Sequence, residues 1–85
     1  MRIQALGHVV LKVRELDRAE QFYAVVLGLP VVARAERAGM TFFSLGNHHD
    51  FAIRAVGDGP TPAADSPGLF HVAFKLETIL TTCAR

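Results

Sequence analysis

Two histidines of the chain occur in the same short pattern, once near each end of the sequence. His8 lies in residues 7–13 (GHVVLKV) and His71 in residues 70–76 (FHVAFKL). Side chains of a β-strand alternate between its two faces, so each histidine shares a face with a lysine and lies opposite an apolar stripe. Neutral imidazole is a common protein ligand of Fe, Mn, Zn, Co and Ni. The repeat therefore predicts two equivalent strands that each supply one ligand to a shared metal site.

A solvent-exposed position is the alternative for His8 and His71, because a lysine accompanies each of them on its face. Two imidazoles also make a weak metal site, which normally needs at least one carboxylate in addition. We favour metal binding in the intact protein, because ordinary surface histidines have no reason to recur in register on matching strands.

A second polar group, His48, His49 and Asp50, precedes the last strand expected in the first part of the chain. One of its histidines, with His49 as our choice, would act as acid and base, because imidazole exchanges protons near neutral pH. Asp50 would orient that histidine or bind the metal itself. An ordinary polar hairpin end explains the same three residues equally well.

Three cations are candidates for substrate binding. Lys12, Lys75 and Arg54 would meet an anionic substrate if the face on which they lie lined a cavity. Solvated surface charges are the simpler interpretation of the same residues.

The composition describes one small soluble domain. A hydrophobic content of 51% argues for a packed core. The net charge of +1, with both signs mixed along the chain, gives no case for a nucleic-acid or membrane partner. No uncharged run approaches the length of about 20 residues that spans a bilayer. The single cysteine, Cys83, excludes an intrachain disulfide, and we expect a cytoplasmic protein.

The framework for these residues begins with a strand and a helix. Residues 6–13 predict the strand, and Asp17 is expected to be the N-cap of the helix, with Glu20 completing a capping box. Apolar residues then recur at helical spacing and give the helix one apolar face, which includes Phe22. Gly28 is the expected end of this helix.

Three further strands complete one βαβββ unit of the α+β class within residues 1–57. They are expected at residues 29–35, 40–45 and 50–56, the last two as a hairpin. Residues 58–69, rich in proline and glycine, form a connector. Residues 70–85 then supply the first strand of a second module, which we expect to be truncated because too few residues remain for its helix and other strands.

With these elements in place, the sequence resembles the vicinal oxygen chelate superfamily, which includes glyoxalase I, extradiol dioxygenases and bleomycin resistance proteins. The resemblance lies in residues 7–13, in residues 17–30 (DRAEQFYAVVLGLP) and in residues 70–74 (FHVAF). It implies that two βαβββ units pair around an open cavity, and that the first and last strands of the units supply the metal ligands. His8 and His71 match the first-strand ligand positions of two successive units.

The resemblance also bears on the kind of enzyme. Glyoxalase I-like enzymes place a ligating carboxylate on the fourth strand, where this chain has Ala52. Extradiol dioxygenases use two histidines and a later glutamate around Fe(II), and many place an acid/base histidine beside the fourth strand, as His49 is here. The resemblance therefore implies a catechol-cleaving dioxygenase, with Fe(II) as first choice of metal and Mn(II) as the alternative. Pairing of modules implies a homo-oligomer, such as a dimer.

Two other interpretations stay open. One is a non-catalytic module of the bleomycin resistance type, which binds a small molecule without metal in a cavity lined by aromatic residues such as Phe43. The other is an inactive truncated fragment. The expected glutamate ligand lies beyond Arg85, and the substrate-binding residues are not identified by the sequence.

Overall fold

The computed structural model describes residues 1–46, 50–69 and 71–75 of the chain. Its elements follow the order expected for a βαβββ unit, which confirms the predicted α+β class. They are β1 (Val9–Val13), α1 (Leu16–Gln21), the π-helical turn η1 (Phe22–Val26), β2 (Val31–Ala35), the 3-10 turn η2 (Glu36–Ala38), β3 (Met40–Phe43) and β4 (Phe51–Ala55).

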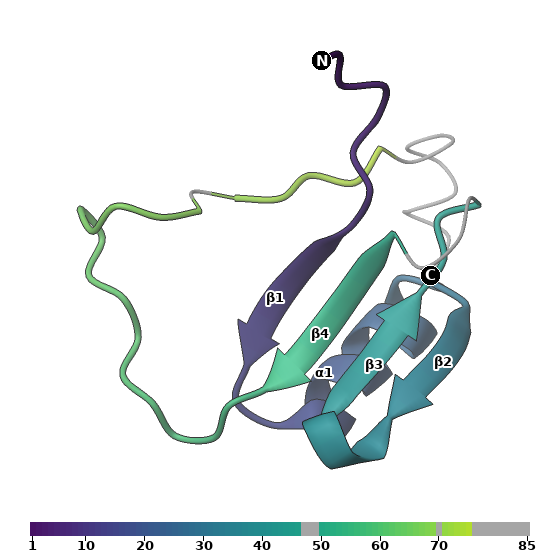
Figure 1. Cartoon of the computed structure of the whole chain (residues 1–85). Helices are drawn as coiled ribbons and strands as arrows, with labels where there is room; N and C mark the ends of the chain where they lie inside the picture. Colours follow the sequence, from purple (N-terminus) through teal and green to yellow (C-terminus); the bar gives the residue numbers. More distant parts are fainter. Residues whose placement is uncertain (47–49, 70, 76–85) are drawn as a thin grey trace.

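The four strands form one sheet in the order β1-β4-β3-β2. β1 runs parallel to β4, whereas β3 is antiparallel to both of its neighbours. The predicted hairpin of the last two strands is thereby confirmed. α1 lies behind the sheet in Figure 1, so a helix covers one face of the sheet and leaves the other face open.

The helix begins earlier than predicted. Its N-cap is Glu15, with no side-chain cap, and Asp17 lies inside the first turn. The expected capping box is wrong, because the carboxylate of Glu20 bonds to Arg34 and Thr41 on neighbouring strands instead of to the helix terminus. Asp17 still favours the helix electrostatically, since a negative charge stabilises the first turn.

The last turn of the helix is π-helical. The amide of Leu27 donates to the carbonyl of Phe22 (3.0 Å), and the amide of Leu29 donates to the carbonyl of Tyr23 (2.9 Å). Gly28 ends the helix as predicted, with a φ of 77° that only glycine adopts readily. Tyr23 points into the core, whereas Phe22 is 47% exposed, contrary to the expected apolar face.

Aromatic rings fill the space between the helix and the sheet. Phe43, Phe51 and Ile53 are fully or almost fully buried, and Tyr23 packs against both phenylalanines, with ring centroids 6.0 Å from Phe43 and 5.1 Å from Phe51. Phe74, from the far end of the described chain, adds a T-shaped contact with Phe51 at 5.2 Å. These ring contacts join the helix, β3, β4 and residues 71–75 into one core.

The connector leaves β4, swings out beside the sheet and returns near the opposite end, where β1 begins (Figure 1). Residues 71–75 follow it and lie in no strand, so the strand predicted for a second module is not formed there. The burial of these residues alternates as predicted, with Phe74 turned inward and His71 exposed. A strand needs a neighbour to complete its backbone hydrogen bonds, and none of the described strands pairs with this segment.

Candidate functional site

The sheet presents two chemically different faces. Phe51 and Ile53 of β4 pack toward α1, and the period of two places Ala52 and Arg54 on the opposite side. The same alternation assigns side chains of β1 and β3 to this side. We call it the open face, and in β1, β3 and β4 it consists of Val10, Lys12, Met40, Phe42, Ala52 and Arg54.

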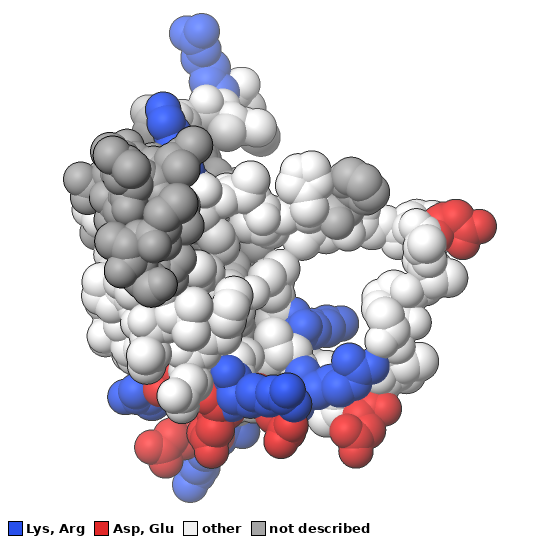
Figure 2. Space-filling model, turned by 180° about the vertical axis from the view of Figure 1, so that it is seen from behind, with Lys and Arg blue, Asp and Glu red and all other residues white. Residues whose placement is uncertain are grey.

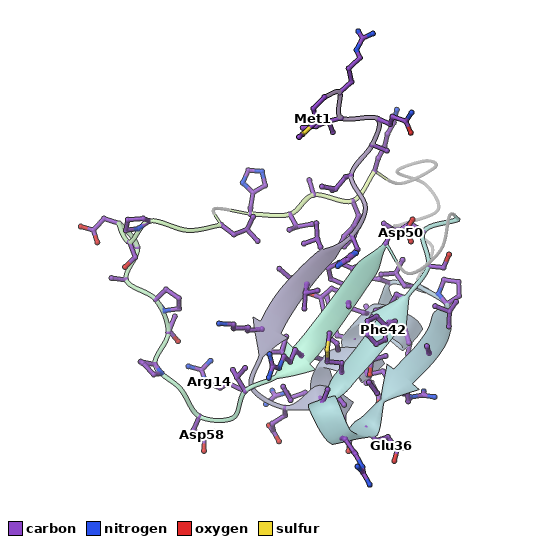
Figure 3. The ribbon with its side chains drawn as sticks, viewed as in Figure 1. Met1, Arg14, Glu36, Phe42, Asp50 and Asp58 are labelled. Atoms are coloured by element: carbon purple, nitrogen blue, oxygen red, sulfur yellow. The ribbon has the colours of Figure 1, made fainter. Side chains whose placement is uncertain are left out.

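Strand register arranges the open face in rows that run across the sheet. Val10, Ala52 and Phe42 are direct neighbours and form an apolar row. Ala52 is fully buried in the middle of this row, whereas Val10 is 40% exposed and Phe42 is half-buried. Figure 3 labels Phe42 on β3. This row is an apolar floor whose accessible surface comes from Val10 and Phe42.

Two residues further along the strands the open face becomes cationic. Lys12 and Arg54 are register partners on adjacent strands, and both are exposed. Met40 is the next neighbour of Arg54 in the same row. Neither cation forms an ion pair with an acidic residue in the described parts of the chain. The salt bridge found there joins Arg34 and Glu20 on the helix side of the sheet.

The other end of the open face carries His8 and Asp50. β1 begins at Val9, so His8 directly precedes the strand rather than lying within it, and its side chain is exposed. The amide of Val9 donates to the carbonyl of Asp50 (3.1 Å), which continues the parallel pairing to this end. His8 and Asp50 are thereby brought to the same end of two adjacent strands.

Asp50 has a structural partner. Its Oδ1 accepts a hydrogen bond of 2.7 Å from the amide of Leu45, on the other side of the hairpin turn. Figure 3 labels Asp50 at the start of β4. This contact supports the interpretation of Asp50 as part of an ordinary polar hairpin end. A role of Asp50 toward a metal or toward His49 stays a prediction.

The predicted metal ligands do not form a complete site in the part of the chain that the structure describes. No cluster of three or more His, Cys, Asp or Glu residues that could hold a metal ion occurs there. His71 lies in the exposed segment after the connector, and His48 and His49 lie outside the described residues. Of the predicted histidine ligands, His8 and His71 both lie in the described residues, and two imidazoles do not fit a stable Fe(II) or Mn(II) site without a carboxylate.

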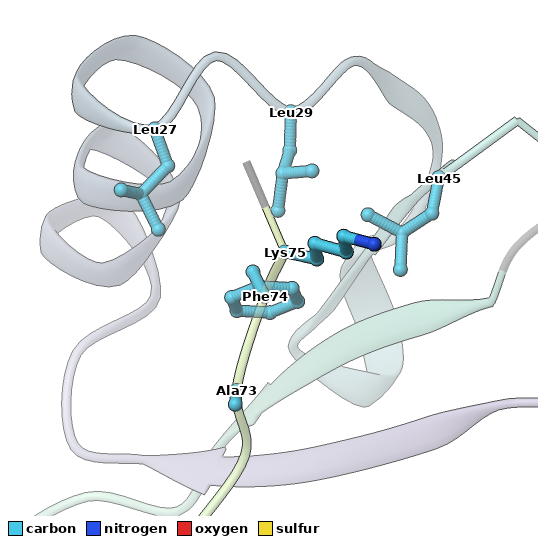
Figure 4. Close-up of a pocket in the computed structure, with 6 residues that line it drawn as sticks. All are labelled: Leu27, Leu29, Leu45, Ala73, Phe74 and Lys75. Atoms are coloured by element: carbon cyan, nitrogen blue, oxygen red, sulfur yellow. The ribbon is translucent and has the colours of Figure 1, made fainter. Parts of the chain in front are cut away.

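A separate apolar cavity of about 460 Å³ lies between the end of the helix and residues 71–75. Figure 4 shows the side chains of Leu27, Leu29, Leu45 and Phe74 directed toward a common space, with the ammonium of Lys75 close to Leu45. The spacing of these leucines gave no sign of the cavity, because it exists only where Phe74 folds back onto the core.

The sequence also gave no sign of a polar clip on the helix side. Arg34 donates from Nε and Nη2 to the two carboxylate oxygens of Glu20 (3.1 and 2.8 Å), and the hydroxyl of Thr41 donates to Oε1 (2.8 Å). Thr41 is fully buried. The hydrogen bonds from Arg34 and then Thr41 lower the pKa of Glu20 below its ordinary value of 4.5, against an opposing effect of burial. The clip ties the helix to β2 and β3.

Charged side chains gather along one rim of the molecule. Seen from the helix side, Figure 2 shows both signs along the rim at which the helix begins, whereas most of the remaining described surface on that side is uncharged. Near the same end, the guanidinium of Arg14 donates to the hydroxyl of Thr61 (2.7 Å) and the carbonyl of Gly59 (3.3 Å). These bonds hold the start of the connector against the end of β1 (Figure 3).

Comparison with known proteins gives a fold and a family. A search of curated proteins finds no match to the chain. Separately, none of the described helices is long and apolar enough to cross a membrane. The crystal structure of the integron cassette protein HFX_CASS4, from the mobile metagenome of the Halifax Harbour sewage outfall, has a similar fold, with a TM-score of 0.61 and 19% sequence identity. The likeness covers 72% of this chain and 53% of that one. This chain therefore spans about half the length of that protein.

The family model of the Glyoxalase/Bleomycin resistance protein/Dioxygenase superfamily matches residues 5–85. That match includes β1, the helix, the remaining three strands and the segment that contains His71. The chain belongs to the Glyoxalase/Bleomycin resistance protein/Dioxygenase superfamily.

Proposed function

We propose that this chain is the N-terminal module of a metal-dependent extradiol dioxygenase that cleaves a catechol-type vicinal diol. The observation that carries the proposal is the open face of the sheet. It combines a potential metal ligand, His8, at one end with an apolar floor in the middle. A flat aromatic ring fits such a floor, because apolar contact with Val10 and Phe42 removes both partners from water.

The fully buried Ala52 supports a dioxygenase over a glyoxalase I type of enzyme. It occupies the position at which the glyoxalase I-like resemblance implies a ligating carboxylate, and its methyl group cannot bind a metal. A dioxygenase would take its carboxylate from elsewhere. In this proposal the missing glutamate comes from a second module in the rest of the intact protein, because an identical copy of the chain would not contain it.

The proposed roles of the histidines follow from their chemistry. His8 and His71 would hold Fe(II), or alternatively Mn(II), through neutral imidazole nitrogens. The metal, when bound, would bring the diol and dioxygen together for electron transfer. His49 would accept a proton from the diol and return it to the product, because imidazole exchanges protons near neutral pH.

The experiment is a metal titration of the full-length protein. After anaerobic loading with Fe(II) and gel filtration, we expect bound metal by elemental analysis, and a loss of most of it in His8→Ala and in His71→Ala. Lys12→Gln is the matched control, because it changes a side chain on the same face of β1 without removing a metal donor. A protein that binds no divalent metal, or an unchanged content in His8→Ala, would contradict the proposal.

A second function has its own structural support. The cavity beside Phe74 is mainly apolar in its described lining and has the size of a small-molecule site. It favours a non-catalytic binding module of the bleomycin resistance type. Phe43, expected to line such a cavity, is fully buried in the core, and Phe74 takes that place. This function predicts ligand binding that survives EDTA and is lost in Phe74→Ala.

A further inference from the structure

We propose that the open face binds an apolar ligand that carries a carboxylate, and that Lys12 and Arg54 hold this carboxylate. The inference rests on the proposed function, because it names the class of substrate that the same open face accepts: an aromatic acid rather than a neutral aromatic compound.

The first observation is a pair of like charges in register. Lys12 and Arg54 are direct partners on β1 and β4, on the same face and both exposed. Like charges directly opposite one another on adjacent strands destabilise a sheet. Neither cation has an acidic partner among the described residues. A bound carboxylate would relieve this repulsion, and a guanidinium can hold it with two parallel hydrogen bonds.

The second observation is the apolar row beside these cations. Val10 and Ala52 precede Lys12 and Arg54 by two residues, and Phe42 follows Met40 by two because β3 is antiparallel, so the two rows are adjacent on the same face. Ala52 is fully buried between two larger side chains, so a ring would lie over Val10 and Phe42. Two residues of a strand correspond to roughly 7 Å, which is comparable with the separation of ring and carboxylate in phenylpropionate. One such molecule can therefore touch both rows.

The third observation is a wall at the cationic end. A hollow of about 370 Å³ opens beside Lys12 and Arg14 and is closed on its other side by connector residues that include Gly59, Pro60 and Thr61. The guanidinium of Arg14 donates its hydrogen bonds to Gly59 and Thr61 and so holds this wall in place. Arg14 adds positive charge to the corner, but we do not expect it to bind the carboxylate directly. The carboxylate would lie beside a partly enclosed cationic corner, where screening by water is weaker than on a flat surface.

The experiment measures binding of phenylpropionate and of its methyl ester to the full-length protein by calorimetry. These probes contain no diol, so their binding does not require a metal, and the titration is repeated with EDTA. We expect the acid to bind about tenfold more tightly than the ester, as one charge-assisted interaction allows. Acetate, which lacks the ring, should bind more weakly than phenylpropionate.

Variants locate the carboxylate. Arg54→Gln and Lys12→Gln should each remove most of the preference for the acid without loss of stability, because both side chains are exposed and each change relieves the repulsion between the two cations. Arg2→Gln and Lys75→Gln are the matched controls, since they remove an exposed arginine and lysine elsewhere. Equal binding of acid and ester, or no measurable binding, would overturn the proposal. A preference lost in Lys75→Gln but kept in Arg54→Gln would also overturn it and would place the carboxylate at the cavity beside Phe74.

This test separates the inference from the function on which it rests. A preference for the acid that depends on Lys12 and Arg54 and survives EDTA supports the carboxylate site even if the metal titration fails. Bound metal that depends on His8, together with equal binding of acid and ester, keeps the dioxygenase and overturns the carboxylate site.

Discussion

The two faces of the sheet differ in how fully their side chains are packed and paired. On the helix side, Tyr23, Phe43 and Phe51 are in mutual ring contact, and Glu20 ties the helix to two strands. On the open face, Val10 is 40% exposed and two cations stand side by side with no acidic partner in the described residues. The helix side therefore supplies most of the stability of the unit, whereas the open face is available to a ligand or a second module.

The core should show the largest effect. Phe51→Ala removes a ring that contacts Tyr23, Phe43 and Phe74, and we expect a loss of about 3–5 kcal/mol in the free energy of unfolding. Phe42→Ala is the matched control, because it removes the same side chain from the half-buried open face and should cost clearly less. Urea denaturation followed by circular dichroism measures both. Equal losses would erase the distinction between the two faces.

The polar clip should show an intermediate effect. Glu20→Ala leaves the fully buried hydroxyl of Thr41 without its acceptor, and we expect a cost of about 1–3 kcal/mol. Asp58→Ala removes an exposed carboxylate of the connector and should change stability by less than about 0.5 kcal/mol. Thermal unfolding of the two variants against the parent tests this difference. If Glu20→Ala were as stable as Asp58→Ala, the clip would not contribute to the stability of the helix on the sheet.

The clip also makes a smaller contribution that depends on pH. Because its pKa is lowered in the folded protein, ionised Glu20 stabilises the fold above its ordinary value of 4.5, and this contribution is lost as pH falls through the lowered value. The stability advantage of the parent over Glu20→Gln should therefore shrink as pH is lowered from 6 into that range. Denaturation at several pH values measures it. An advantage that grows toward acid pH would contradict a lowered pKa of Glu20 in the folded protein.

The connector should show the smallest effect on stability. Arg14→Ala removes exposed hydrogen bonds to Gly59 and Thr61, and we expect less than about 0.5 kcal/mol. Amide hydrogen exchange should nevertheless become faster around Gly59 and Thr61, because the side-chain bonds that hold them are lost while the backbone bond from Gly57 to Arg14 remains. Arg18→Ala, which removes an exposed arginine of the helix, is the control. Unchanged exchange in Arg14→Ala would show that the bonds do not order the connector.

Most of the fold followed from local patterns in the sequence. Alternation of apolar and polar residues located β1 and β4, the hairpin was confirmed, and Gly28 marked the end of the helix. The errors concern residues whose partners are distant. Glu20 was assigned to a capping box because only its near neighbours were visible, and Phe22 was assigned to the core because the π-helical turn has no sequence signal.

The candidate site was predictable in its residue types but not in its arrangement. The repeat singled out His8 and His71, and the structure places His8 beside the strand that begins after Asp50. Lys12 and Arg54 were two separate cations in the sequence, 42 positions apart by number (54 − 12). They become a pair only because β1 pairs with β4 in one specific register.

The sequence by itself determined the order of the elements, the two faces of each strand and the end of the helix, because these depend on the conformational preferences of neighbouring residues. The tertiary structure alone decided which strands are neighbours and which side chains meet. It paired Lys12 with Arg54, fastened Glu20 to Arg34 and Thr41, and brought Phe74 onto Phe51. Contacts between distant residues depend on how the whole core packs, and no local pattern records that.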